Sequence, residues 1–215
     1  MAARKKVSGS RYENYLIKHG VAKSTTNKKA VDRLLKIQPN LDLVDYPSPS
    51  KYFENTWKAI SSGRGFSRNM SGECFELIMA CILIKEGITP FYMQAEVQFV
   101  PDARFDILIF TQEIGPIALS LKTSLRERYK QAELEAISLK SVHRKAQTFL
   151  ITNNEIEARQ NQKRVDQGVF IGIKKVLIPQ SPALDELVNY LKTFTPIMTG
   201  EVPIISLPST GRIVN

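Results

Sequence analysis

The feature that most constrains the fold is an apolar strand that changes into a charged helical pattern without a linker. Residues 117–124 (IALSLKTS) have the composition of a strand, and the helical pattern runs from about 125 to 140. A lysine, Lys122, sits inside the strand, and two arginines bracket a glutamate at positions 126–128. A folding core does not need this arrangement, so the stretch is the first candidate for a functional site.

Length and composition predict one compact domain. The chain has 215 residues, 43% of them hydrophobic, which is enough for a sizeable core. We divide it into a helical basic N-terminal subregion (1–69), a core (70–195) and a loop-rich tail (196–215). The formal charge of +9 favours a polyanionic partner. Charge alone implies only non-specific attraction, however, and a merely basic surface is the alternative.

The cysteines and the hydropathy pattern predict a cytoplasmic protein without a membrane partner. Cys74 and Cys81 are seven residues apart in an apolar helical run, so both are expected in the core. Two buried thiols indicate a reducing compartment and no disulfide framework. No apolar run approaches the roughly 20 residues that cross a bilayer, and the basic N-terminus is not followed by a hydrophobic signal region.

Strand and helix patterns alternate along the core, which predicts an α/β fold with helices flanking a central mixed sheet. Strands are expected at 91–100, 105–110, 117–124, 146–153 and 169–178. Helices are expected at 11–20, 28–37, 70–87, 125–140, 155–168 and 181–194. The tail is expected to form a loop with one short strand.

The clearest helix, residues 70–87, carries two acids in its first turns. Ser71 is the expected N-cap, and Gly87 ends the pattern. Glu73 and Glu76 are three residues apart and therefore share one face. One explanation is compensation of the helix dipole, which favours acids at a helix start. The functional explanation is an extra carboxylate beside a metal site.

Residues 51–69 mix aromatic and basic side chains around two glycines, and we expect a flexible basic loop there. Arg64 and Arg68 could contact DNA phosphates. The aromatic residues could stack on a base, although such residues more often belong to a core: Tyr52, Phe53 and Trp57.

The two central strands are expected to form a hairpin centred near Ile114, with Phe110 opposite Ala118 and Asp106 opposite Lys122. An acid and a lysine then meet at the end of an apolar hairpin. Carboxylates that hold Mg²⁺, with a lysine nearby, supply what phosphodiester hydrolysis requires. The alternative is a buried salt bridge, which is costly because both ions lose their water.

The acid on one strand and the lysine on the next resemble the PD-(D/E)xK nuclease superfamily. The dipeptide Pro101-Asp102 is present too, but Asp102 falls outside the hairpin ladder, so Asp106 is preferred. Ser120 stands where the usual second acid would be, two residues before the lysine. A Ser-x-Lys motif followed after twelve intervening residues by Glu135 is similar to the rearranged motif of type II restriction endonucleases in the EcoRII/PspGI group.

This resemblance implies a restriction-endonuclease-like core and assigns roles to four residues. Asp106 and Glu135 would hold Mg²⁺, and Lys122 would be catalytic. Glu76, in preference to Glu73, would be an auxiliary acid.

The resemblance extends to base recognition. Members of the group that read CCNGG or CCWGG carry Arg-Glu-Arg four to six residues after the lysine, and this chain has Arg126, Glu127 and Arg128 there. Arginine suits bidentate donation to guanine, and glutamate accepts from cytosine N4. Lys130 and Gln131 would continue the DNA-facing surface. For Glu127 a capping box with Ser124 is the alternative, whereas cations at a helix start are unfavourable without an anion.

The resemblance implies a homodimeric type II restriction endonuclease of the prokaryotic cytoplasm. It would use Mg²⁺ to hydrolyse both strands of double-stranded DNA at a short palindrome with CC/GG half-sites. The alternatives are a structure-specific repair or junction nuclease of the same fold and a catalytically silent DNA-binding protein. The sequence has no phosphate-binding glycine loop, so no nucleotide cofactor is expected.

Overall fold

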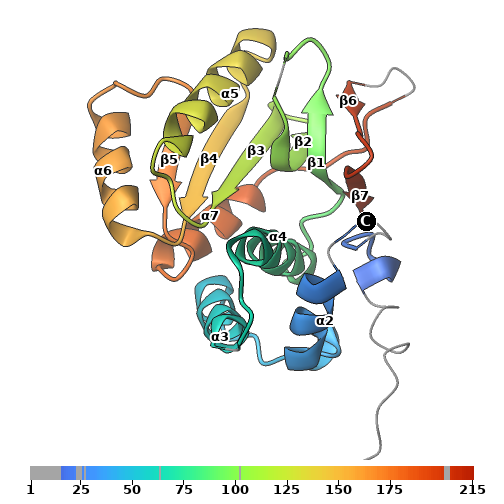
Figure 1. The fold of residues 1–215 in the computed structure, drawn as a ribbon. Coiled ribbons are helices and arrows are strands. Elements are labelled where there is room, and N and C mark those ends of the chain that lie inside the picture. Colours follow the sequence, from blue (N-terminus) through green and yellow to red (C-terminus); the bar gives the residue numbers. More distant parts are fainter. Residues whose placement is uncertain (1–15, 23–25, 27, 63, 102, 201–203) are drawn as a thin grey trace, which may run out of the picture.

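The fold is α/β, as the sequence predicts, with a seven-stranded mixed sheet at its centre (Figure 1). The strand order is β5-β4-β3-β2-β1-β6, and β7 also pairs with β1. Strand β2 is antiparallel to both of its neighbours, β1 and β3, whereas β3, β4 and β5 are parallel. The computed structural model describes residues 16–22, 26, 28–62, 64–101, 103–200 and 204–215.

The elements follow the alternation read from the sequence. The strands are β1 Phe91–Val97, β2 Phe105–Thr111, β3 Gly115–Lys122, β4 Gln147–Thr152, β5 Ile173–Leu177, β6 Ile205–Ser206 and β7 Arg212–Val214. The helices are α2 Lys28–Ile37, the 3-10 helix η1 Leu41–Leu43, α3 Pro49–Ser61, α4 Arg68–Lys85, α5 Arg128–Val142, α6 Glu155–Asp166 and α7 Pro182–Leu191. The first half of the expected helix at 11–20 lies outside the described residues, and residues 16–18 are helical.

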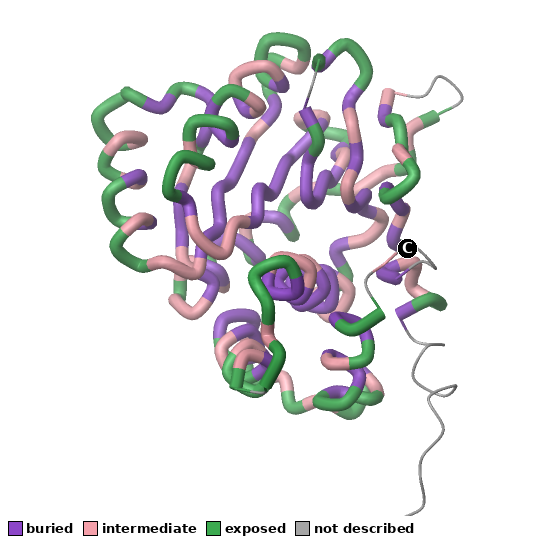
Figure 2. The backbone as a smooth tube through the Cα atoms, viewed as in Figure 1, coloured by how far each residue is buried: buried purple, intermediate pink, exposed green. Residues whose placement is uncertain are grey.

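Both faces of the sheet are covered, so the central strands are buried along most of their length (Figure 2). Alternate residues of β2 and β3, such as Ile107 and Leu119, share one core cluster with α2, α3, α4 and α7. Helix α4 lies directly on these strands, and α2 and α3 pack against α4. The residues between them, such as Leu108 and Ala118, face the opposite side, where α5 and α6 lie. Phe105 packs in the same cluster as Leu108, so the alternation breaks at the start of β2. The position of Asp106 is therefore given by its own hydrogen bonds and not by the alternation.

Helix α4 is the central helix of the core, as predicted, but its start differs. Ser67 is the N-cap, since its hydroxyl accepts a hydrogen bond from the Met70 amide. Ser71, the predicted cap, is buried in the first turn and donates to the Arg68 carbonyl at 2.6 Å. Cys74 and Cys81 are buried in the core, as predicted. The prediction of the cap failed because two serines four residues apart both precede apolar runs.

The expected flexible loop at 51–69 is wrong for most of its length. Ser48 accepts a hydrogen bond from the Lys51 amide and Pro49 occupies the first turn, so helix α3 continues to Ser61. Tyr52 and Phe53 are fully buried in the core, where they cannot stack on a base. The sequence contained this cap signal, but the glycines that follow obscured it.

The β2–β3 hairpin is shifted by two residues from the predicted register. Ala118 pairs with Leu108, and Phe110 pairs with Pro116 instead of Ala118. The turn is tighter than expected because the Thr111 hydroxyl donates to the Gly115 carbonyl at 2.8 Å. Since strand side chains alternate with period two, a shift of two keeps every side chain on its predicted face.

Three boundaries also differ from the sequence predictions. Helix α5 starts at Arg128, three residues later than expected. Strand β5 is shorter than the apolar run 169–178, and the tail forms two short strands, β6 and β7, both paired with β1. Within the described ranges, no helix is long and apolar enough to cross a membrane.

The approach of Gly172 to α5 gives a stability prediction. A Cβ at Gly172 would lie 2.6 Å from the Ile137 amide nitrogen and 2.8 Å from the Ala136 carbonyl carbon. We expect Gly172→Ala to lower the free energy of unfolding by about 1–3 kcal/mol, because helix backbone must move. Gly72→Ala is the matched control. A Cβ there has nothing within 4 Å, so this change should stabilise α4 by about 0.5–1 kcal/mol. Equal effects in urea denaturation would contradict the packing described.

Candidate functional site

An ion pair between Asp106 and Lys122 forms the centre of the candidate site. Lys122 Nζ lies 2.8 Å from Asp106 Oδ2, and the side chains of Lys122 and Asp106 are only 16% and 12% exposed. The same Oδ2 accepts the Leu121 amide at 2.7 Å, and Oδ1 accepts the Gln94 side-chain amide at 3.3 Å. Asp106 is therefore held by three donors, from β3 and from β1, and the predicted pairing of acid and lysine is present despite the shifted register.

Lys122 keeps its proton in this environment. Burial by itself would lower the pKa of Lys122, but the charge and hydrogen bond of Asp106 outweigh burial, and Glu135 and Glu76 add to them, so the pKa is raised. The site therefore presents a fixed ammonium group at the end of β3. Ser120 lies two residues earlier on the same face. It is buried, and its hydroxyl has no hydrogen-bond partner among the described residues.

Glu76 and Glu135 approach this pair from two different helices. Burial, followed by the negative charge of Asp106, raises the pKa of Glu76 on α4 to about 8. Burial also raises the pKa of Glu135 on α5, which accepts a hydrogen bond from the Gln131 amide at 2.8 Å. Both glutamates lie close enough to Asp106 for its negative charge to raise their pKa values. The structure thus brings together the four residues that the sequence analysis singled out as catalytic.

The donor set of this region fits Mg²⁺. Among the described residues, no group of three or more His, Cys, Asp or Glu side chains is placed to hold a metal ion. Mg²⁺ does not need such a group, because it is usually bound through one or two carboxylates and keeps several waters. Asp106 and Glu135, with Glu76 nearby, supply carboxylate oxygens, which are the hard ligands that this ion prefers.

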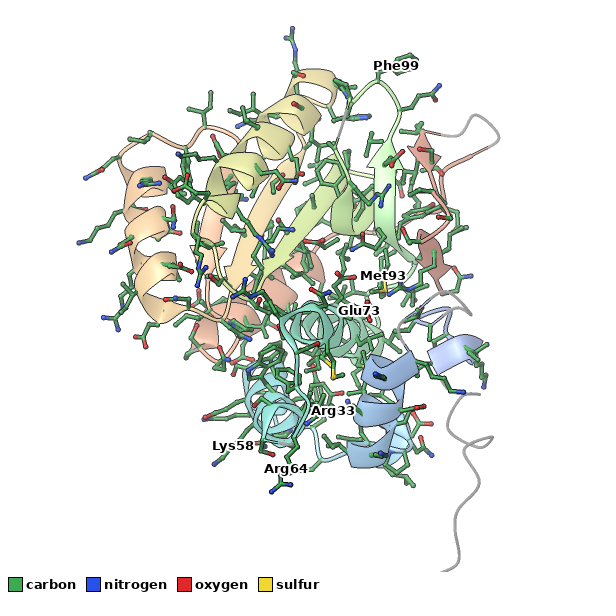
Figure 3. All side chains as sticks on the ribbon, in the orientation of Figure 1. Arg33, Lys58, Arg64, Glu73, Met93 and Phe99 are labelled. Carbon is green, nitrogen blue, oxygen red and sulfur yellow. The ribbon has the colours of Figure 1, made fainter. Side chains whose placement is uncertain are left out.

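Glu73 belongs to a neighbouring cavity of about 220 Å³ and not to the Asp106–Lys122 pair itself. Figure 3 shows Glu73 on α4 next to the end of β1 that carries Met93. The sequence analysis missed Arg212 of β7, which is only 6% exposed. Burial lowers the pKa of Arg212, and the negative charges of Glu76 and Glu73 offset only part of that effect. The residues that line the cavity are Thr26, Glu73, Glu76, Leu77, Gln94, Arg104, Thr210 and Arg212.

The segment that links β3 to α5 exposes Arg126, Glu127 and Arg128 to solvent. Arg126 has a φ of 37°, in the left-handed region that a residue with a side chain rarely adopts. Glu157 of α6 holds this turn, because its carboxylate accepts the Leu125 amide at 2.6 Å and the Arg126 amide at 3.1 Å. The arginines are therefore presented from a fixed backbone and not from a mobile loop.

The predicted capping box is absent from this part of the described structure. Glu127 occupies the N-cap position of α5 without a side-chain cap hydrogen bond. Its carboxylate instead forms an ion pair with Lys130 at 2.6 Å, and Lys130 lowers the pKa of Glu127. Glu157 instead binds the amides of Leu125 and Arg126, between the two residues of the predicted box, and α5 begins only at Arg128.

Arg68 is the predicted DNA contact that the structure joins to the two recognition arginines. A cleft of about 280 Å³, which we call the basic cleft, is lined by Arg68, Thr123, Ser124, Arg126 and Arg128. Three arginines from α4 and from the β3–α5 turn converge there. No acidic side chain lines this cleft within the described residues, so its potential favours an anion.

The other predicted DNA contacts are placed differently. Arg64 lies on the outer surface of the helical layer, away from the sheet (Figure 3), in a separate hollow with Arg33 and Lys36. Trp57 is packed between aromatic core residues and stacks on Phe53, with ring centroids 5.7 Å apart.

Gln131 and Asp102 are the two remaining residues named in the sequence analysis. Gln131 is hydrogen-bonded to Glu135, as described above, although the side chain is exposed. Asp102 lies outside the described residues, so the choice of Asp106 over it rests on the geometry of Asp106 alone.

Gln94, Glu157 and Arg212 are functional candidates that sequence reasoning missed. Only Glu157 had a local signal, since Asn154 precedes it by three residues and caps α6 by accepting its amide at 3.1 Å. Gln94 and Arg212 reach the site through strand pairings that no local pattern encodes. No protein-family model, no curated protein and no solved structure matches this chain. The functional argument therefore rests on the site itself.

The raised pKa of Glu76 predicts a pH dependence of stability. Between about pH 4.5 and about pH 8 the folded protein retains a proton on Glu76 that the unfolded chain has lost, so the free energy of unfolding falls as pH rises. Glu76→Gln is neutral at every pH and removes this slope. Urea denaturation in EDTA at about pH 5 and about pH 8 should show a loss in the parent that exceeds the loss in the variant by more than about 1 kcal/mol. Parallel profiles would refute the burial of an ionisable Glu76.

Proposed function

We propose that this chain is a type II restriction endonuclease that cuts double-stranded DNA at a short palindrome with CC/GG half-sites, of the CCGG, CCNGG or CCWGG type. The observation that supports the proposal is the buried Asp106–Lys122 pair with Glu76 and Glu135 facing it. The basic cleft begins immediately after that pair on the same segment. Its place would be in restriction–modification defence in a prokaryotic cytoplasm.

In this proposal Lys122 stabilises negative charge on the phosphate under attack. Its ammonium group is protonated and fixed by Asp106, so it can donate hydrogen bonds to the oxygens on which charge develops. Asp106 and Glu135 would hold Mg²⁺, with Glu76 as the auxiliary acid. When bound, the ion supplies charge neutralisation at the phosphate and activation of the attacking water. Lys122 and Asp106 otherwise act by positioning, because their hydrogen bond restricts both side chains before DNA arrives.

Sequence reading would come from the turn that Glu157 holds. Arg126 and Arg128 can each donate two hydrogen bonds to guanine O6 and N7 in the major groove. Glu127 can accept from cytosine N4 once its ion pair with Lys130 opens, and Arg68 can neutralise a phosphate at the same cleft. A palindromic target calls for a two-fold symmetric homodimer, so each subunit would read one CC/GG half-site.

Digestion of plasmid DNA with Mg²⁺ tests the proposal. The parent protein should give discrete, reproducible bands, and Lys122→Ala should give none, because the charge next to the phosphate is lost. Lys122→Ala should still bind DNA in Ca²⁺, which shows that it is folded, and Lys58→Ala, an exposed lysine on α3, should cut normally. A smear would indicate a sequence-independent nuclease, and absence of cutting by the parent would indicate a silent DNA-binding protein. Full activity of Lys122→Ala would refute the catalytic assignment.

Single arginine substitutions test the reading role. Arg126→Ala and Arg128→Ala should each lose about 1–3 kcal/mol of discrimination between the target and a single-base variant, because a bidentate contact to guanine disappears. Arg64→Ala is the matched control, since that side chain lies on a separate surface. The measurement is the ratio of kcat/KM on the two DNA substrates. A ratio unchanged from the parent in both variants would contradict the assignment.

A further inference from the structure

Strand β1 is distorted at the point where it passes the candidate site. Gln94 has a φ of 51°, in the left-handed region, although it lies inside a strand and carries a side chain. Its neighbours pair regularly with β2, as Met93 with Ile107 and Ala95 with Phe105. These two pairs place Gln94 opposite Asp106, so the distortion falls beside the acid that holds Lys122. Such conformations are strained and are found where function or packing fixes them.

The backbone of Gln94 is fixed from the side of β7. A Cβ at Gly211 would lie 2.9 Å from the Gln94 carbonyl oxygen, so the backbone before Arg212 packs directly on the distorted residue. Arg212 itself pairs with Met93, one residue before Gln94. The C-terminal strand therefore supports the unusual conformation from one side while β2 pairs with the other.

The side chain of Gln94 connects two carboxylates that come from different elements. Its amide nitrogen donates to Asp106 Oδ1 at 3.3 Å, and its side chain lines the same cavity as Glu76. The other oxygen of Asp106 is occupied by Lys122 and the Leu121 amide. Gln94 is thus the neutral group that joins the acid of β2 to the acid of α4.

We propose that Gln94 is a positioning residue that holds the Asp106 and Glu76 carboxylates for a divalent cation. The amide separates two groups that repel each other when both are ionised, and it orients the Asp106 oxygen that Lys122 leaves free. The distorted backbone aims the side chain at both acids. The catalytic meaning of the cation rests on the proposed nuclease function, but the positioning role is a property of the DNA-free protein.

The alternative is that the conformation of Gln94 only bends β1, and glycine separates the two explanations. Gln94→Gly keeps a backbone that tolerates positive φ and deletes the amide. Gln94→Ala deletes the amide and keeps the strain of a Cβ at positive φ. Gln98→Ala, at an exposed position just after β1, is the matched control.

Calorimetric titration of the full chain with Mn²⁺, without DNA, measures the positioning role. We expect Gln94→Gly and Gln94→Ala to bind Mn²⁺ about 10–100-fold more weakly than the parent, the range seen when groups that orient metal ligands are removed. Gln94→Gly should keep the parent's thermal midpoint, Gln94→Ala should lower it, and Gln98→Ala should change neither property. In the nuclease assay, Gln94→Gly should need more Mg²⁺ for half-maximal cleavage with an unchanged KM for DNA.

Each outcome decides one of the two proposals. Parent-like Mn²⁺ affinity in Gln94→Gly overturns the positioning role, even if the parent cuts DNA. A parent protein that binds no Mn²⁺ overturns it as well, because no cation is then positioned. Weakened binding in Gln94→Gly alongside a parent that does not cut DNA supports the positioning role and refutes the nuclease function.

Discussion

The ion pair between Asp106 and Lys122 is the interaction on which the rest of the site depends. Removing two charges from water costs several kcal/mol per ion, and the pair is tolerable only if hydrogen bonds satisfy the remaining atoms. The structure meets this condition, because the Leu121 amide and Gln94 complete the hydrogen bonding of the carboxylate. Two layers of helices exclude water from the strands beneath it, and the same helices bring Glu76 and Glu135 to its edge.

The parts of this site that follow period-two or helical spacing could be predicted from the sequence. Alternation alone predicts that Asp106 and Lys122 share one face of the hairpin. A register error of two residues does not change that prediction. The register itself could not be predicted, because the Thr111 hydroxyl tightens the turn. Spacing also placed Glu76 on α4 and Glu135 on α5, but only the assembled sheet and helices make them neighbours of Lys122.

The groups that fix the site come from distant segments, and for that reason they were missed. Glu157 binds the amides of Leu125 and Arg126 from helix α6, which lies far along the chain from this turn. Gln94 and Arg212 approach through the pairing of β1 with β2 and β7. Likewise, the sequence leaves base stacking open for Tyr52 and Phe53 beside a place in the core, and the packing of α3 against α4 decides for the core. Local sequence patterns indicate which reactive side chains are present, whereas long-range pairing determines which other residues fix their positions.

Catalytic and recognition residues share one continuous segment in the proposed nuclease. Lys122 ends β3, Arg126 follows four residues later in a left-handed conformation, and Glu135 lies on the helix that this turn starts. Because Glu157 anchors the turn between them, base contacts and the charged pair are held in a fixed relation. When the arginines bind the correct bases, the short segment between Arg126 and Lys122 would place a DNA phosphate next to Lys122.

Mapping the ends of fragments produced from a randomised DNA library tests this account most directly. With the parent protein and Mg²⁺, the account predicts that every cut falls at a fixed position within one two-fold symmetric site containing CC and GG. Cuts distributed over unrelated sequences, or located only at junctions and mismatches, would contradict it.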